Sequence, residues 1–272
     1  MKRIAWSVPV LLLAIAPVSA KRVAAPPNPV QRALQAEVVV AGKVTSIEKE
    51  PVEIESGGQK TAYKIAVIKI ESALAGAANT THIKVGFPAA AVGRGPRVSL
   101  EENQEGLFFL TKHASGQFHT YNWMGSPVLS ADENYKAVTA NVKRALAVVA
   151  DPIKSLKAEK AEDRSFAAIA LIIKNRTIPQ TEGKELGLEK LPAEESKLIL
   201  KGLAEASWSK FDASLPPPAN AFYMLGLTTE DGWNAPKALP GADFNETMRE
   251  AFGKWVEGAG KEYRINKFVL KK

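Results

Sequence analysis

The chain contains no cysteine among its 272 residues. This absence excludes disulfide bonds, thiol catalysis, thiolate metal sites and a lipoprotein anchor attached through cysteine. Stability must therefore come from core packing without disulfide bonds. With 46% hydrophobic residues the chain is able to bury a sizeable core, and its length favours two domains over one.

Blocks of like charge are also missing. The formal net charge is +7, but the basic side chains are scattered, and only Lys267, Lys271 and Lys272 gather near one end, among apolar residues. A protein that binds nucleic acid or an anionic membrane usually carries a basic patch or stripe. We therefore expect no nucleic-acid partner.

The sequence offers few of the motifs that carry common chemistries. Gly93 and Gly95 lack the lysine and serine of a phosphate-binding loop, and Ser126 lacks the flanking glycines of a nucleophile elbow. The pairs Glu101-Glu102 and Glu194-Glu195 are adjacent in sequence, so their side chains would not face one another across a substrate. The sequence predicts no cofactor and favours a protein that is not an enzyme.

A single long apolar run stands at the N-terminus. The basic pair Lys2-Arg3 precedes the mostly apolar residues 4–15, and small residues lead to Ala20. These are the three regions of a secretory signal peptide, whereas a membrane-spanning helix needs about 20 apolar residues. We expect a signal peptide over residues 1–20, export to the periplasm or beyond the cell, and no transmembrane segment after cleavage. Loss of the basic pair would lower the formal net charge from +7 to +5.

After an extended linker expected over residues 21–35, the front half of the chain reads as short β-strands. The stretches are rich in β-branched and aromatic residues, alternate apolar and polar side chains at least in part, and are separated by turn residues. Five such strands are expected, over residues 37–47, 62–71, 82–87, 106–111 and 117–121. They suit a small, coiled β-barrel within residues 36–130.

From residue 131 onward the apolar spacing changes to that of helices. Helices are expected over residues 131–149, from Pro152, over 162–175, from Pro192, over 219–225 and after Asp243, which with Glu246 resembles a capping box. Residues 177–191 read as irregular, and residues 263–270 as a final strand. The predicted fold class is α+β, with a five-stranded OB-like β-barrel followed by a mainly α-helical domain over residues 131–272.

The expected strands resemble the netrin-like, tissue-inhibitor-of-metalloproteinase type of OB-fold module. The residues that carry this resemblance are 36–44, 63–67, 83–85 and 106–110. The resemblance implies binding, but in that family an N-terminal cysteine chelates the zinc of the protease, and this chain has none. The remainder, through residues 198–204, 222–227 and 231–233, resembles uncharacterised bacterial exported proteins, which implies no activity.

Two histidines form a candidate metal site. His113 and His119 flank the turn at Ser115-Gly116, and a loop centred on Gly116 would place them opposite one another on two strands. Protein zinc sites use three or four ligands, so a third would have to come from His82, Glu101 or Glu102. The alternative is that both histidines are ordinary exposed hairpin residues.

Aromatic residues of the helical part form a candidate binding site. Trp208 and Trp233 lie near expected loops, and Asp231 lies in the turn just before Trp233. Tryptophan near a loop can bind a sugar or a protein partner, although packing in the core is its commoner use. These three residues are the ones we assign to binding.

Three functions remain open on the sequence alone. The first is an exported, non-enzymatic protein that binds another protein or an envelope component. The second is a metal-dependent or hydrolytic extracytoplasmic enzyme that uses His113 and His119. The third is a structural protein of the envelope.

Overall fold

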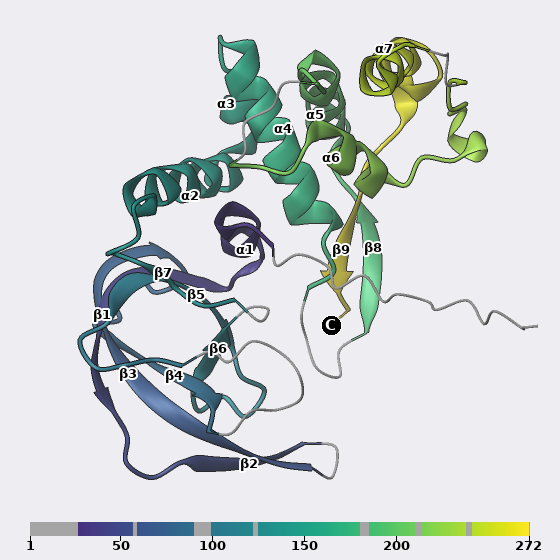
Figure 1. The fold of residues 1–272 in the computed structure, drawn as a ribbon. Helices are drawn as coiled ribbons and strands as arrows, with labels where there is room; N and C mark the ends of the chain where they lie inside the picture. The colour runs from purple at the N-terminus through teal and green to yellow at the C-terminus, as the bar shows by residue number, and fades with distance from the viewer. Residues whose placement is uncertain are drawn as a thin grey trace, which may run out of the picture.

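A β-barrel followed by a bundle of helices makes up the computed structural model of the chain (Figure 1). The structure describes residues 27–56, 59–89, 99–121, 125–179, 185–209, 214–237 and 241–271. The predicted α+β class and OB-like barrel are thus confirmed. The predicted signal peptide lies outside the described residues. Within the described ranges, no helix combines the length and apolarity needed to cross a membrane.

Five strands close the barrel. They are β1 (Val38–Ile47), β3 (Gln59–Ala75), β4 (His82–Pro88), β5 (Glu105–Lys112) and β6 (His119–Tyr121). Their order around the barrel is β1-β3-β4-β6-β5, and β5 pairs with β1 to complete the circle. Every pairing is antiparallel except that of β4 with β6, where Val85 lies opposite His119. This is the Greek-key order expected of an OB-type barrel.

Both faces of β1 and β5 are buried, which explains their continuous apolar sequences. Val40 and Phe108 point into the barrel, where they pack in its own core. Val39 and Phe109, their neighbours on the two antiparallel strands, point to the opposite face and join the core of the helical part. The barrel therefore shares one of its faces with the helices.

Three further strands extend or accompany the barrel. β2 (Val52–Ser56) pairs with β3, and β7 (Val128–Leu129) pairs with β5. β8 (Leu186–Lys190) pairs with β9 (Asn266–Leu270) in a separate two-stranded ribbon. The prediction that residues 177–191 are irregular is wrong for β8, because the partner that makes this glycine-containing segment a strand lies far away in the sequence.

Seven helices are present in the described part of the chain. They are α1 (Pro29–Gln35), α2 (Tyr135–Ala150), α3 (Pro152–Leu156), α4 (Ala161–Arg176), α5 (Ala193–Glu205), α6 (Pro218–Leu225) and α7 (Phe244–Glu257), with short 3-10 turns η1 (Thr229–Asp231) and η2 (Ala259–Glu262). Residues 165–173 of α4 are all buried, because α1, α2, α3, α5, α6 and β9 all pack against this helix (Figure 1).

Helix α1 joins the barrel to the other helices and occupies the second half of the range expected to be a linker. Asn28 and Gln31 cap its start reciprocally, as a capping box. The guanidinium of Arg32 lies 4.5 Å from the centre of the Phe109 ring, and its Nη2 donates to the carbonyl of Gly125 at 3.0 Å. Burial lowers the pKa of Arg32 to about 10.

Candidate binding site

Aromatic rings from four neighbouring segments pack together in the helical part. The ring centres of Phe222 and Trp233 are 5.1 Å apart, and Phe252 lies 6.0 Å from Trp208 and 5.7 Å from Trp255. All five residues are buried. Large rings contribute much apolar area on burial, so this cluster stabilises the arrangement of α6, α7 and the segment after α5.

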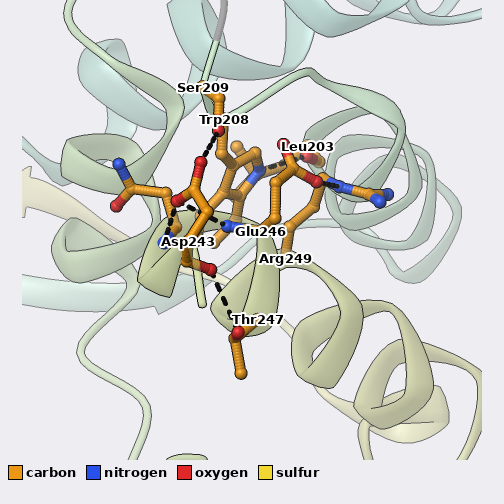
Figure 2. Close-up of polar contacts among 8 residues, drawn as sticks. Leu203, Trp208, Ser209, Asp243, Glu246, Thr247 and Arg249 are labelled. Atoms are coloured by element: carbon orange, nitrogen blue, oxygen red, sulfur yellow. Dashed lines mark hydrogen bonds and ion pairs between the residues drawn. The ribbon is translucent and has the colours of Figure 1, made fainter. Parts of the chain in front are cut away.

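Ser209 holds the start of α7, while Trp208 bonds the same segment to α5 (Figure 2). The ring nitrogen of Trp208 donates to the carbonyl of Leu203 at 3.1 Å, and Ser209 Oγ donates to Asp243 Oδ2 at 2.5 Å. The other carboxylate oxygen of Asp243 accepts from the backbone N–H of Asn245 at 2.9 Å, as an N-cap residue does. The Ser209 hydroxyl and these backbone donors hold the pKa of Asp243 below its usual value. The segment after α5 is thereby bound to the first turn of α7.

This cap positions an exposed ring. Phe244 is the first residue of α7 and remains 42% exposed, while Tyr223 on α6 is 61% exposed. Both belong to a hollow of about 210 Å³ lined by Phe222, Tyr223, Gly226, Leu227, Trp233, Ala235, Phe244 and Met248. Trp233 is only 7% exposed and so forms part of the wall that the hollow shares with the core.

The turn before Trp233 is shaped by Asp231. Asp231 Oδ2 accepts from the backbone N–H of Thr228 at 2.9 Å, and its carbonyl accepts from the ring N–H of Trp255 at 2.9 Å. Gly232 follows in the left-handed region, with φ of 71°, and a Cβ there would lie 2.8 Å from the Cβ of Ala259. Asp231 therefore orients Trp233 and Trp255 instead of lining the hollow itself.

The three residues singled out for binding thus take different places. Trp233 lines the hollow, Trp208 packs behind it in the aromatic cluster, and Asp231 holds the connecting turn. The sequence pattern does not single out Phe244, because helical spacing puts it in line with the buried residues Met248 and Phe252. Its position directly after the N-cap residue Asp243 could have indicated that it is exposed, because the helix has no preceding turn that could cover its side chain.

The two candidate metal ligands lie on opposite faces of their hairpin. Lys112 is the cross-strand partner of His119, and the backbone N–H of His113 donates to the carbonyl of Phe118 at 2.9 Å. Because successive residues of a strand alternate between faces, His113 and His119 point in opposite directions. The His113 ring stacks on Phe118, with ring centres 4.6 Å apart. In the part of the chain that the structure describes, no three His, Asp or Glu side chains gather as metal ligands would.

A larger hollow, of about 270 Å³, lies beside α4. Arg144 and Glu205, two of the charged residues that line it, are already paired. Arg144 Nη2 is 2.5 Å from Asp163 Oδ1 and its guanidinium lies 3.8 Å from the centre of the Phe166 ring, while Glu205 is 2.8 Å from Arg164. We therefore favour the smaller hollow, where exposed rings have no such partners to give up.

The lining of the smaller hollow determines what it can accept. The described residues that line it carry no carboxylate, imidazole or amine, and the Tyr223 hydroxyl is its one ionisable group. Such a lining suits an apolar or aromatic group and supplies no acid–base pair. A scan against protein-family models finds no match to this chain, and a search of curated proteins finds no significant match either.

Proposed function

We propose that the chain is an exported, non-enzymatic binding protein, and that the hollow between α6 and α7 receives an apolar or aromatic group of another protein or of an envelope component. One observation carries the proposal: Tyr223 and Phe244, two exposed rings, lie at the same hollow, whose wall includes Trp233. Aromatic residues at a concave site are the usual anchors of a binding surface.

The surroundings of the hollow favour binding because they hold it in shape. Asp243 and Ser209 fix the first turn of α7, and Gly226 ends α6 in the left-handed region with φ of 68°. A site that is already ordered loses little conformational entropy when a ligand enters. Exposed apolar rings also gain free energy when a partner removes them from water, by roughly 25 cal/mol per Å².

Two sequence features support the wider proposal. The expected signal peptide over residues 1–20 predicts export from the cytoplasm, and the resemblance of the barrel strands to netrin-like modules implies a binding role. The partner would then be a protein or another component of the same compartment.

Affinity capture with surface variants tests this proposal. The immobilised wild-type protein is expected to retain a component of an extracytoplasmic extract, and Tyr223→Ser or Phe244→Ser is expected to weaken its retention about tenfold or more, since central aromatic anchors are worth about 2 kcal/mol or more. Ile178→Ser is the matched control, because Ile178 is 53% exposed but does not line the hollow.

Two results would count against the proposal. Equal retention by wild type and by both ring variants would remove the hollow as the binding site. Failure of the wild type to retain any component would favour the structural alternative. A change in intrinsic tryptophan fluorescence on adding the captured component, lost in Tyr223→Ser, would provide an independent readout of binding.

A further inference from the structure

The ribbon of β8 and β9 has an open edge. β9 packs against α4, and β8 lies on the side of β9 turned away from the barrel (Figure 1). Four of the five β8 residues are exposed. Within the described ranges, β8 pairs with β9 and with no other strand.

The backbone groups of β8 divide between the two edges. The N–H of Leu191 donates to the carbonyl of Ile265 at 2.8 Å, and the N–H of Lys271 donates to the carbonyl of Glu185 at 2.8 Å. In an antiparallel pair, hydrogen-bonded positions recur at every second residue. The odd-numbered residues of β8 therefore bond to β9. The N–H and C=O groups of Leu186, Leu188 and Lys190 point outward, along the open edge, where the Lys190 carbonyl also accepts a hydrogen bond from Arg264 Nη2 at 3.3 Å.

The same ribbon has an apolar face and a charged face. Leu186 and Leu188, 40% and 59% exposed, lie opposite Leu270 and Phe268, so these four side chains share one face. An exposed apolar edge strand with free backbone groups is a template for pairing with another chain.

Ion pairs occupy the other face. Glu189 lies 3.1 Å from Lys267, and Lys271 lies 3.1 Å from Glu185. A Cβ on Gly187 would lie 3.3 Å from the Cγ of Lys271, so the lysine side chain runs over this glycine.

We propose that β8 is a self-association edge, at which two copies of the chain pair antiparallel about a two-fold axis through Leu188. An antiparallel pair of identical strands is closed, because each copy uses its edge to satisfy the other. This register places Leu188 opposite itself and Leu186 opposite Lys190 of the second copy. All three positions are those whose backbone groups point outward.

The charged face is complementary in this register. Glu189 of one copy lies opposite Gly187 of the other, over which Lys271 runs. Each copy thereby places a carboxylate beside an ammonium group of the second copy, in two symmetric contacts. On the other face, the Leu188 side chains of both copies meet at the axis, and each Leu186 lies beside them, opposite Lys190 of the second copy. The charges and the central Leu188 pair thus agree with the same two-fold axis, which is why a second copy fits this edge.

The expected dimer is weak. A strand pair of this length is expected to bury less than the roughly 1,200 Å² at the lower end of stable interfaces. The association should therefore depend on protein concentration, with monomer on dilution and dimer at high concentration.

Sedimentation velocity over a concentration series tests the edge. Wild type is expected to shift from monomer to dimer, and Leu188→Lys to raise the dissociation constant about tenfold or more, since it places like charges opposite one another at the axis. Ile178→Lys, an exposed apolar site off the ribbon, should leave the dimer unchanged. A wild type that stays monomeric at its highest soluble concentration, or a Leu188→Lys variant that still dimerises, would overturn the proposal.

An exchange of charges tests the register. Glu189→Lys and Lys271→Glu should each weaken self-association, because each places like charges together across the axis. An equimolar mixture of the two variants should restore dimers, since both contacts are then again between opposite charges. Circular dichroism of each variant confirms that it is folded. A mixture that associates no better than either variant alone would overturn the register and the axis with it.

Discussion

Burial lowers the pKa of His119, more than the carboxylate of Glu37 raises it, and nearby Lys112 lowers it further. The imidazole lies in β6, directly across from Lys112 on β5. The folded protein therefore disfavours the protonated form of His119 relative to the unfolded chain.

This shift predicts how stability depends on pH. The unfolded pKa of histidine is about 6.5, so below that pH the unfolded chain binds the proton before the folded protein does. The contribution of His119 to the free energy of unfolding is therefore fully present above about pH 6.5. It declines as the pH falls through the interval between the unfolded pKa and the lower folded pKa. Urea unfolding at about pH 7.5 and about pH 5.5 should show a smaller loss of stability for His119→Asn than for wild type.

His82→Asn is the control for this measurement, because the His82 side chain is exposed. It should keep the loss of stability that wild type shows. Equal losses in wild type and His119→Asn would contradict the assignment to His119.

A single residue of register separates the expected hairpin from the observed one. Centring the loop on Gly116 placed His113 opposite His119, but the partner of His119 is Lys112. A shift of one position moves a side chain to the other face of the sheet. Composition and turn residues identify a hairpin, yet they do not fix its register, so a two-ligand site inferred in this way depends on tertiary contacts that the sequence does not display.

The candidate site was only partly visible in the sequence for a related reason. Trp233 could be singled out by its residue type and its turn, and it does line the hollow. Tyr223 and Phe244 are not singled out by residue type or spacing, because both lie within expected helices. Whether such a ring is exposed depends on how α6 and α7 pack together. Helical periodicity describes a single helix, so it cannot predict this exposure.

At the scale of elements, the helix caps show which contacts can be predicted from neighbouring residues alone. Asp243 caps α7 as its sequence predicts, with its carboxylate accepting from the backbone of Asn245. Glu246, expected to complete a capping box, instead bonds Arg249 at 2.6 Å. The full box occurs at α1, between Asn28 and Gln31. A cap residue acts within one turn and is predictable, while its acidic companion has competing partners.

Substitution of Asp243 should therefore lower the free energy of unfolding more than substitution of Glu246. Asp243→Ala is expected to lower the free energy of unfolding by about 0.5–2 kcal/mol, because it leaves the helix N-terminus and Ser209 without their acceptor. Glu246→Ala should cost less, about 0–1 kcal/mol, since it removes a partly exposed ion pair. Urea denaturation measures both. A loss for Glu246→Ala as large as that for Asp243→Ala would show that the pair with Arg249, and not the cap, secures the start of α7.

The strands that the sequence missed share a physical reason. The five barrel strands carry β-branched and aromatic residues in number, so their own composition identifies them. β8, by contrast, contains Gly187, and three of its residues or immediate neighbours are charged: Glu185, Glu189 and Lys190. Its composition does not favour a strand, and it becomes one because it pairs with β9. β2 alternates apolar and polar side chains and is not among the five expected strands, although it continues the hairpin with β3.

For the whole molecule, the boundary between strands and helices in the sequence does not coincide with the boundary between the two hydrophobic cores. The change from strands to helices after residue 130 is clear in the sequence and in the order of elements. The larger core nevertheless includes Val39 and Phe109 of the barrel together with Leu34 of α1 and the buried side of α4. A second, smaller core fills the barrel itself. The barrel therefore has an interior of its own but depends on the helices to cover one outer face.

This shared core predicts that the barrel and the helices unfold together. Phe109→Ala should lower the free energy of unfolding by about 3–5 kcal/mol, since it opens a cavity between the two parts. Hydrogen exchange followed by mass spectrometry should then show equal losses of protection in β3, a barrel strand, and in α7, which lies far from Phe109 in the sequence. Tyr223→Ser, on the exposed face of α6, is the control and should leave both segments unchanged. Loss of protection confined to β3 would mean that the barrel opens separately, in which case the shared core would not couple the two parts.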